Sequence, residues 1–417
     1  MGVDTQDGGA DIPERRTPEL QAVPDSPEGA VKRHVLDRVE VVQGGITEVH
    51  VENAIRELEQ SRAQSFAGKD FGLERTEGSD TFSIVSRGGS DEGRDEQEAQ
   101  RFTIETLGDP DHESVAKVHE FMGEIFGKEE LDPLDIMQEQ MRGQRYGCDI
   151  DTRAVYFAVK NEKGEVITTL GGGLLPLRNE RGEASNQAVF MVFYVATDPK
   201  LRQYGLGREV MISAYRQAME EAKSRGLDFV GAAGECTWRS RAFWERVGWR
   251  RAYAEDPDTG VAEEVPYVQP PLAFDLETGN VEEGAGDAPE HFMIDLFNPA
   301  KASGEEVPEL LNGVVRAFYH TNNSVGKAAF EREAGSSEKA KAAFDRHREA
   351  IRPHEERFSA ALKGKNISFL TEKEVVARRA DGVTVTDYVT SDEEQEAQKS
   401  KEAARAFREQ QDSSDVL

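Results

Sequence analysis

The sequence VATDPKLRQYGLG at residues 195–207 is the most informative stretch of this chain. Its first part is apolar and typical of a buried strand, which we expect to end at Pro199 because proline lacks the amide hydrogen that a central strand donates. Gly205 and Gly207 precede a long amphipathic segment, which predicts a helix. Glycine adopts backbone angles that side chains forbid and lets another molecule approach the main chain. The first amides of a helix have no partner within it, and Arg202 adds a positive charge, so this turn is expected to bind an anion.

Two common phosphate-binding motifs are excluded at this turn. A P-loop needs Gly-Lys-Ser/Thr, whereas Gly207 is followed by Arg208-Glu209. A Rossmann fingerprint needs three glycines in G-x-G-x-x-G spacing, and only Gly205 and Gly207 are present. The spacing that remains, Arg-x-x-Gly-x-Gly after a strand, fits a pyrophosphate. Taken without its surroundings, it could also be a glycine-rich start of a helix that binds nothing.

The segments on both sides of the motif follow a regular order. Upstream, apolar periodicity predicts an amphipathic helix within 30–62, a strand at 102–107, a helix over 115–125, and strands at 154–159, 166–170 and 186–197. Downstream, we expect a helix at 205–226, a buried strand at 227–233, a short helix at 238–247, and strands at 249–253, 265–274 and 291–297.

The motif and the order of these elements resemble the GNAT-type N-acetyltransferase superfamily. In that family a coenzyme A loop follows the fourth strand, and a long helix, a fifth strand and a short helix come next. The family's second signature ends in a Gly-aromatic step and is similar to SRAFWERVGW at residues 240–249. The resemblance covers about residues 101–300. It implies an α/β (α+β) fold, with a mixed and mostly antiparallel sheet flanked by helices.

The resemblance also implies that acetyl-CoA or another acyl-CoA is the co-substrate and that no metal takes part. It assigns cofactor binding to the fourth strand, the loop and the short helix, at Val195, Thr197, Arg202, Gln203, Tyr204, Gly205, Leu206, Gly207, Arg208, Thr237, Ser240 and Trp244. Two of these depart from the family pattern. Thr237 replaces an asparagine that commonly contacts the cofactor, and Trp244 replaces a tyrosine that often protonates the leaving thiolate. An indole N–H is not a useful acid, so the general acid is unassigned.

Acyl transfer to an amine requires a base for the ammonium proton and donors for the tetrahedral oxyanion. The resemblance places the thioester carbonyl against main-chain amides at about Tyr194 and Val195. Glu235, at the end of the fifth strand, is the candidate base if burial raises its pKa, and Asp198 is a weaker candidate. Glu235 could equally be a carboxylate that only precedes a helix. Cys236 has no histidine near it in the sequence to activate it, so we expect a small buried cysteine rather than a nucleophile.

The composition limits the partners of the chain. Its 51 Lys and Arg against 80 Asp and Glu give a formal charge of −29, which disfavours nucleic acid and anionic membranes. This acidity fits either a surface adapted to salt or acidic tails. Apolar runs fall short of the roughly 20 residues that span a bilayer, and the first residues lack a secretion signal, so we expect a soluble cytoplasmic protein. The histidine pairs lack the spacing of zinc helices, so no metal site is expected.

One acidic stretch bears on the acceptor. Between Arg251 and Lys301 the sequence holds twelve carboxylates and neither Lys nor Arg. In the family, this part borders the acceptor side, so one interpretation is a cationic acceptor such as an amino acid, a polyamine, an aminoglycoside or a lysine side chain. The other interpretation is an acidic solvated surface. The proline-rich residues 265–271 predict an edge strand or lid, in which Tyr267 and Gln269 could contact an acceptor or only pack.

We expect four regions: a largely disordered or loosely packed arm (1–100), the acyltransferase domain (101–300), a helical extension with a β-hairpin at Asp381-Gly382 (301–390), and a charged tail (391–417). The apolar stripe at 307–318 must be buried against the sheet, a second copy in a homodimer, or another partner. The predicted function is direct transfer of an acetyl or other acyl group from acyl-CoA to a primary amine. The alternatives are a non-catalytic acyl-CoA sensor or interaction protein, and an assembly protein built on the C-terminal helices.

Overall fold

The computed structural model describes residues 46–65, 71–75, 81–86, 100–126, 131–202, 204–271, 274–282, 288–297, 306–323 and 325–388. Apart from Ile46, all of them belong to one unit, Thr47–Leu417. Gln203, a predicted cofactor residue, lies outside the described residues, as do residues 1–45 of the predicted arm and the predicted tail at 391–417.

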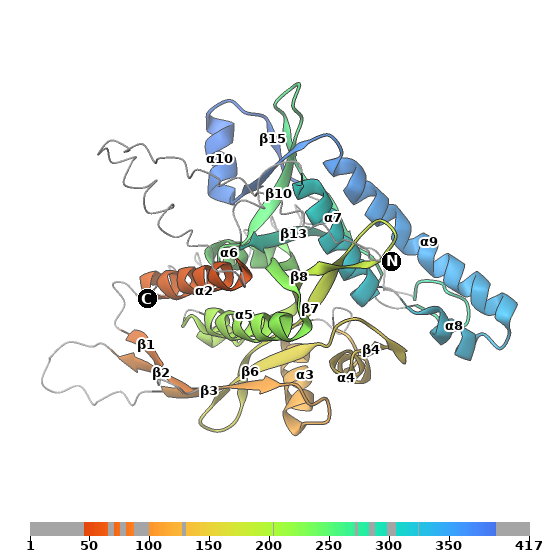
Figure 1. Cartoon of the computed structure of the whole chain (residues 1–417). Coiled ribbons are helices and arrows are strands. Elements are labelled where there is room, and N and C mark those ends of the chain that lie inside the picture. The colour runs from red at the N-terminus through yellow and green to blue at the C-terminus, as the bar shows by residue number, and fades with distance from the viewer. Residues whose placement is uncertain are drawn as a thin grey trace, which may run out of the picture. The chain divides into compact units, whose positions relative to one another are not determined.

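A mixed sheet runs through the described residues (Figure 1). Its strands follow the order β1 (Phe71–Arg75), β2 (Thr81–Ser86), β3 (Gln100–Leu107), β6 (Val155–Asn161), β7 (Val166–Arg178), β8 (Ala184–Thr197), β9 (Asp228–Cys236), β13 (Ala288–Leu296), β10 (Arg250–Glu255), β11 (Ala262–Glu264) and β15 (Val385–Thr386). Along this path, only the β8–β9 and β11–β15 pairs are parallel. Beside it, β12 (Tyr267–Gln269) pairs with β13, and β14 (Asn366–Leu370) pairs with β10. The predicted fold class, mixed and mostly antiparallel, is confirmed.

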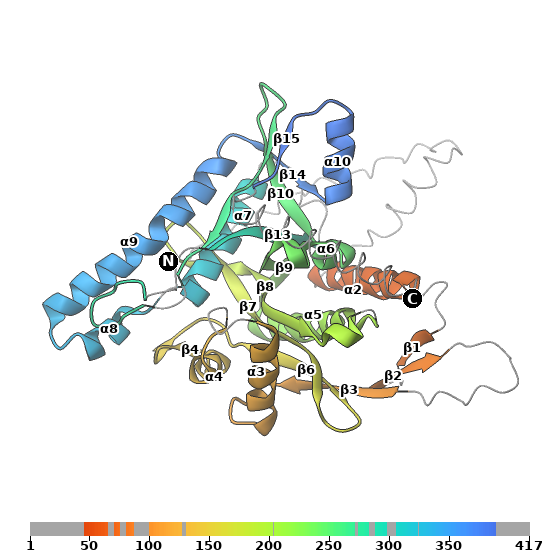
Figure 2. The same cartoon turned by 180° about the vertical axis from the view of Figure 1, so that it is seen from behind.

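Helices cover both faces of the sheet (Figures 1 and 2). Phe190 and Met191 follow each other in β8 but belong to different hydrophobic cores, because successive side chains of a strand point to opposite faces. On the Phe190 face lie α2 (Ile46–Ser65), α5 (Leu206–Arg225) and α6 (Trp238–Arg246). On the Met191 face lie α3 (Glu113–Ile125), α4 (Leu134–Arg142), α7 (Val307–Phe318), α8 (Lys327–Glu333) and α9 (Ser337–Leu362). A separate two-stranded sheet, β4 (Gln144–Arg145) and β5 (Cys148–Asp149), follows α4.

The apolar stripe of α7 is buried within the chain. Leu311, Val314 and Phe318 lie in the same core as Leu177 of β7 and Met191 of β8. The sheet itself is therefore the surface that this stripe covers, which is one of the three partners that the sequence left open.

The predicted arm contributes to the core where the structure describes it. Val51 of α2 and Phe82 of β2 are fully buried in the Phe190-face core. The helix α2 runs antiparallel along α5, because Glu48 pairs with Lys223 at 2.8 Å and Glu59 with Arg216 at 3.2 Å. The amphipathic helix expected within residues 30–62 thus overlaps α2, while the division of the chain into regions at residue 100 stays a prediction.

The hairpin predicted at Asp381-Gly382 is wrong. The preceding residues form the helix α10 (Glu372–Ala380), which begins with a capping box between Thr371 and Glu374. Gly382, with a φ of 85°, follows the end of this helix, and β15 then pairs in parallel with β11. Glycine with positive φ suits the end of a helix as well as a hairpin turn, so the local signal did not distinguish the two.

Candidate active site

The strands β8 and β9 separate before they end. Their parallel pairing runs from Gln187 opposite Asp228 to Val192 opposite Gly234. Beyond this point β8 stays paired with β7 as far as Thr197, and β9 stays paired with β13 as far as Cys236. The sheet therefore divides after Val192. Since amides of a strand point alternately to its two sides, part of those in residues 193–197 face the side that β9 has left.

A β-bulge lies at this division. Gly171 pairs with Tyr194 and Gly172 with Val192, so Phe193 is an extra residue on β8. A bulge leaves one residue out of the ladder and bends its strand. A Cβ at Gly171 would lie 2.2 Å from the Tyr156 ring, so glycine is needed opposite the bulge. The bulge coincides with the main chain at which Tyr194 and Val195 were predicted to meet a carbonyl. The run of three glycines at 171–173 is the feature of the sequence that marks this position.

The glycine loop has the expected conformation. Pro199–Leu201 forms a short 3-10 turn, which the Asp198 carboxylate caps by accepting from the Lys200 amide at 2.9 Å. Gly205 begins α5 with a φ of 72°, a left-handed angle that favours glycine. A Cβ at Gly207 would lie 2.9 Å from the Phe243 ring of α6, so this glycine permits close packing of the two helices. The loop therefore presents the first amides of α5 at the end of β8.

The side chains of the loop divide between surface and interior. Arg202 is exposed, and its Nε donates to the Thr197 carbonyl at 3.4 Å. Arg208 is only 9 % exposed and points toward α6, where its Nη2 lies 3.5 Å from the Arg246 carbonyl oxygen. Burial, with a smaller effect of Arg246, lowers the pKa of Arg208. Tyr204 and Leu206 contribute to the Phe190-face core. The cofactor contacts of these side chains stay predictions. Of the two arginines, Arg202 is exposed to solvent and Arg208 is buried.

The start of α6 lies beside the end of β9. Thr237 caps the helix with its main chain, and the Ser240 hydroxyl donates back to the Thr237 carbonyl at 3.2 Å. Trp244, by contrast, is 2 % exposed, and its ring stacks on Trp249 with centroids 4.2 Å apart. The Trp244 side chain is thus a core residue. Its predicted contact with a cofactor stays a prediction.

Glu235 lies at the end of β9 and accepts a hydrogen bond from a tyrosine hydroxyl. The Tyr267 hydroxyl donates to Glu235 Oε1 at 2.5 Å. Burial and the nearby Glu290 raise the pKa of Glu235 well above its ordinary value, although the Tyr267 hydrogen bond acts in the opposite direction. Tyr267 is fully buried, and the Tyr319 hydroxyl donates to the adjacent Val268 carbonyl at 2.7 Å. Of the two roles that the sequence left open for Tyr267, packing is the observed one.

Tyr194 is tied to the start of α4. Its hydroxyl accepts from the Asp132 amide at 3.1 Å and lies 3.4 Å from Asp132 Oδ2. The same carboxylate receives Gln140 Nε2 at 3.1 Å and lies 3.5 Å from Nη2 of the buried Arg145. Burial raises the pKa of Tyr194, so the hydroxyl stays neutral. The sequence did not indicate Asp132 or Arg145, because no motif links residues 62 positions apart.

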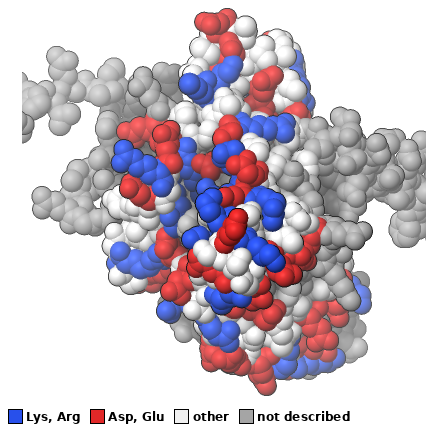
Figure 3. Space-filling view, turned by 90° about the vertical axis from the view of Figure 1, so that its right-hand side faces the viewer, with Lys and Arg blue, Asp and Glu red and all other residues white. Residues whose placement is uncertain are grey.

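The twelve carboxylates between Arg251 and Lys301 do not form one acidic patch. Glu255 pairs with Arg378 at 3.1 Å, Asp256 pairs with Lys365, and Asp295 lies on the Phe190 face near Tyr215. The basic partners come from the segment after residue 360, which sequence order did not bring into view. Glu283 and Asp287 lie outside the described residues. On the face shown in Figure 3, basic and acidic side chains are likewise interspersed.

Two further features concern only the described part of the chain. There, no group of three or more His, Cys, Asp or Glu side chains is placed to hold a metal ion. No helix within the same residues is both long and apolar enough to cross a bilayer.

No family model matches the chain, and no curated protein does. Solved structures do match. A GNAT-family acetyltransferase from Staphylococcus aureus is 14 % identical over 47 % of this chain and 99 % of its own, with a TM-score of 0.28. The NAA60 protein of Arabidopsis thaliana in complex with acetyl-CoA is 8 % identical over 47 % and 98 %, with a TM-score of 0.28. A Trypanosoma brucei acetyltransferase is 19 % identical over 35 % and 91 %, with a TM-score of 0.25.

The class of fold follows from the chain's own geometry. The bulge in β8, its separation from β9, the glycine loop and the helix α5 follow one another in the order that the sequence resemblance implied. Together they agree with the α/β arrangement that the resemblance to GNAT-type proteins implied.

Proposed function

We propose that this protein is an N-acyltransferase that moves an acetyl or other acyl group from acyl-CoA to a primary amine by direct attack. One observation carries the proposal: β8 leaves β9 immediately before the loop that opens α5. Acyl-CoA is a thioester that also carries a pyrophosphate. Its extended arm would lie between the separated strands β8 and β9, and its pyrophosphate would bind the start of α5.

The residues of the loop fit such a ligand. Gly205 supplies the left-handed angle, and the amides of residues 205–207 are proposed to meet phosphate oxygens, since the Arg208 amide already donates to the Gly205 carbonyl. The exposed Arg202 adds charge beside them. The main chain near Tyr194 and Val195, beside the bulge, would receive the acyl carbonyl and stabilise the oxyanion that forms there.

In the proposed reaction, the amine nitrogen forms a bond to the acyl carbon and the carbon–sulfur bond breaks. Glu235 accepts the proton of the ammonium, directly or through water, a role that suits a carboxylate whose pKa is raised by burial. The leaving thiolate takes its proton from water or from a group other than Trp244, which is stacked in the core. Tyr194 positions the bulged main chain through its bonds to Asp132.

The acceptor is proposed to be a cationic primary amine. Glu290 contributes to the raised pKa of Glu235, and a positive group beside Glu235 would favour its charged form. The wider acidic stretch supports the idea less, because Glu255 and Asp256 are paired with Arg378 and Lys365.

Two measurements test the proposal. Mass spectrometry of the purified protein is expected to show a co-purifying acyl-CoA, and acetyl-CoA is expected to be consumed only when a primary amine is added. The burial of Trp244 at the usual position of the acid favours one alternative, a non-catalytic acyl-CoA sensor. Tight binding of acetyl-CoA without turnover across a broad panel of amines would support that alternative, and absence of binding would reject both.

A further inference from the structure

The end of the described chain is joined to the strands next to the candidate site. Residues 365–388, which we call the C-terminal clamp, contain β14, α10 and β15. β14 pairs with β10 from Arg251 opposite Leu370 to Glu255 opposite Asn366, and β15 pairs with β11. The clamp therefore extends the sheet on which the candidate active site lies.

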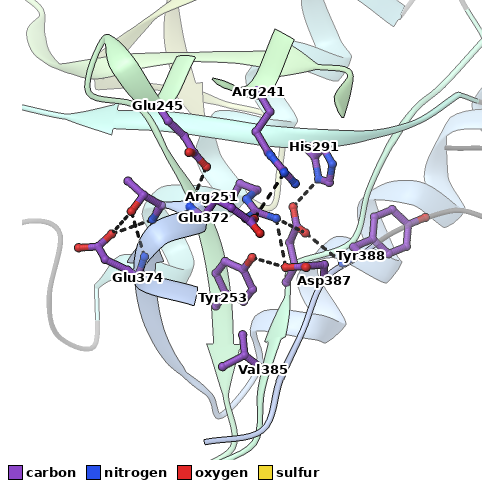
Figure 4. Close-up of polar contacts among 12 residues, drawn as sticks. Arg241, Glu245, Arg251, Tyr253, His291, Glu372, Glu374, Val385, Asp387 and Tyr388 are labelled. Atoms are coloured by element: carbon purple, nitrogen blue, oxygen red, sulfur yellow. Dashed lines mark hydrogen bonds and ion pairs between the residues drawn. The ribbon is translucent and has the colours of Figure 1, made fainter. Parts of the chain in front are cut away.

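Arg251 is the centre of the polar contacts of the clamp (Figure 4). Its side chain is 0 % exposed and pairs with Glu264 at 3.2 Å, Glu372 at 2.8 Å and Asp387 at 3.2 Å. Glu372 and Asp387 belong to the clamp, and the Tyr253 hydroxyl also donates to Asp387 at 2.6 Å. A buried guanidinium needs such partners, because removal of one leaves an uncompensated charge away from water.

One route leads from Arg251 to the start of α6. The Glu372 amide donates to Glu245 Oε1 at 2.9 Å, and Glu372 Oε2 lies 3.5 Å from Arg241 Nη2. Arg241 follows Ser240 in the first turn of α6, and Glu245 lies one turn further on. A single clamp residue thus holds α6 at two points, beside two of the positions predicted to contact the cofactor.

A second route leads from Arg251 to the end of β9. The Glu264 carboxylate pairs with Arg251 through one oxygen and lies 2.6 Å from His291 Nδ1 through the other. The Tyr388 amide of the clamp donates to Glu264 at 3.0 Å. In the β9–β13 register, His291 stands opposite Cys236, the residue after Glu235. Both routes end within residues 235–241.

We propose that the C-terminal clamp sets the position of residues 235–241 for acyl-CoA, with Arg251 and Glu372 as positioning residues. The inference rests on the proposed function of this site. Its physical basis is that moving one partner away from a buried ion pair leaves an uncompensated charge, which disfavours other placements of the elements that supply the members of the cluster. Glu372 lies 121 residues from Arg251 in the sequence, so the extension completes the scaffold of the site.

The test compares Glu372→Gln with Glu374→Gln. The first substitution removes the charge that pairs with Arg251 and Arg241 while keeping the size of the side chain. The second, in the same turn of α10, removes only a charge of the capping box. For Glu372→Gln we expect KM for acetyl-CoA to rise about tenfold with kcat within about threefold of wild type, because binding weakens equally in the ground state and the transition state. For Glu374→Gln we expect an unchanged KM, whatever its effect on Tm.

Hydrogen exchange separates this inference from the proposed function. In peptides covering residues 228–246 of the full chain, Glu372→Gln is expected to speed exchange and Glu374→Gln is not. Asp387→Asn is the second variant if Glu372→Gln does not fold. If the wild-type protein does not bind acetyl-CoA, the proposed function is wrong. The exchange result then tests whether the clamp holds residues 235–241 in place. The same exchange rate in Glu372→Gln and Glu374→Gln, or a KM that rises equally in the two variants, would contradict the proposed role of the clamp.

Discussion

The glycine loop and the cluster around Arg251 are built in opposite ways. The contacts that shape the loop are local: Asp198 caps the Lys200 amide, and Arg202 donates to the Thr197 carbonyl. The cluster joins residues from Arg241 to Tyr388 that lie on α6, β10, β11, β13 and α10 and in the chain after β15. The loop can therefore be recognised as a motif in sequence order, whereas the cluster exists only when distant segments have come together.

The largest expected effect concerns Glu235, which tests whether the chemistry lies beside the loop. Glu235→Gln is expected to lower kcat by about 10²–10⁴, the usual contribution of a general base. Because burial raises the pKa of Glu235, wild-type activity should increase with pH as this carboxyl loses its proton, over a range above that of an exposed carboxyl. The variant should lack that rise in a pH–rate profile. An unchanged profile removes Glu235 from the mechanism.

The next effect tests the cluster as a folding element. Arg251→Met is expected to lower the free energy of unfolding by about 3 kcal/mol, because Glu264 and Asp387 keep buried charges without their partner. Its control is Arg378→Met, which breaks the partly exposed pair with Glu255 and should cost about 0.5 kcal/mol. Denaturant titration measures both. Equal shifts in the two variants would contradict a special role for the Arg251 cluster.

A smaller effect tests the local construction of the loop. Gly205→Ala places a side chain at a φ of 72°, which should cost about 1 kcal/mol and raise KM for acetyl-CoA roughly fivefold. Gly226→Ala is the matched control, since Gly226 ends the same helix at a φ of 67° and faces open space. Calorimetry and steady-state kinetics should show similar strain in both variants but a raised KM in Gly205→Ala alone. A raised KM in both would mean that the loop is sensitive to α5 as a whole.

A last test concerns a half-buried acid outside both regions, Asp295. Burial, and to a lesser degree Glu57, raise the pKa of Asp295 to about 7. The folded protein then binds this proton more tightly than the unfolded chain, so stability falls as pH rises from about 4 to 7 and levels off above that range. Asp295→Asn should flatten this fall in thermal unfolding followed across pH. An identical slope in the variant would show that Asp295 does not titrate in this range.

Much of the sheet and one half of the site could be read from the sequence. Strands such as Ala184–Thr197 and helices such as Leu206–Arg225 carry their own periodicity, and the glycines of the loop mark the start of α5. Trp244 shows the limit of this reading, because its position in a motif gave no sign that the ring stacks on Trp249. The hairpin expected at Asp381-Gly382 failed for a related reason: the same residue types end a helix and turn a hairpin.

By itself, the sequence determined the elements whose signal lies within a few residues, namely single strands such as β8, the glycine loop and the amphipathic α5 that follows it. Only the tertiary structure decided where β8 leaves β9, that Tyr267 bonds Glu235, that Asp132 holds Tyr194, and that the C-terminal clamp surrounds Arg251. The physical reason is that periodicity and turn preference are local properties of the chain. Burial of a charge and the bonds that compensate it depend on distant segments, which here lie 32 residues apart for Tyr267 and Glu235 and 121 or more apart for Arg251 and the clamp.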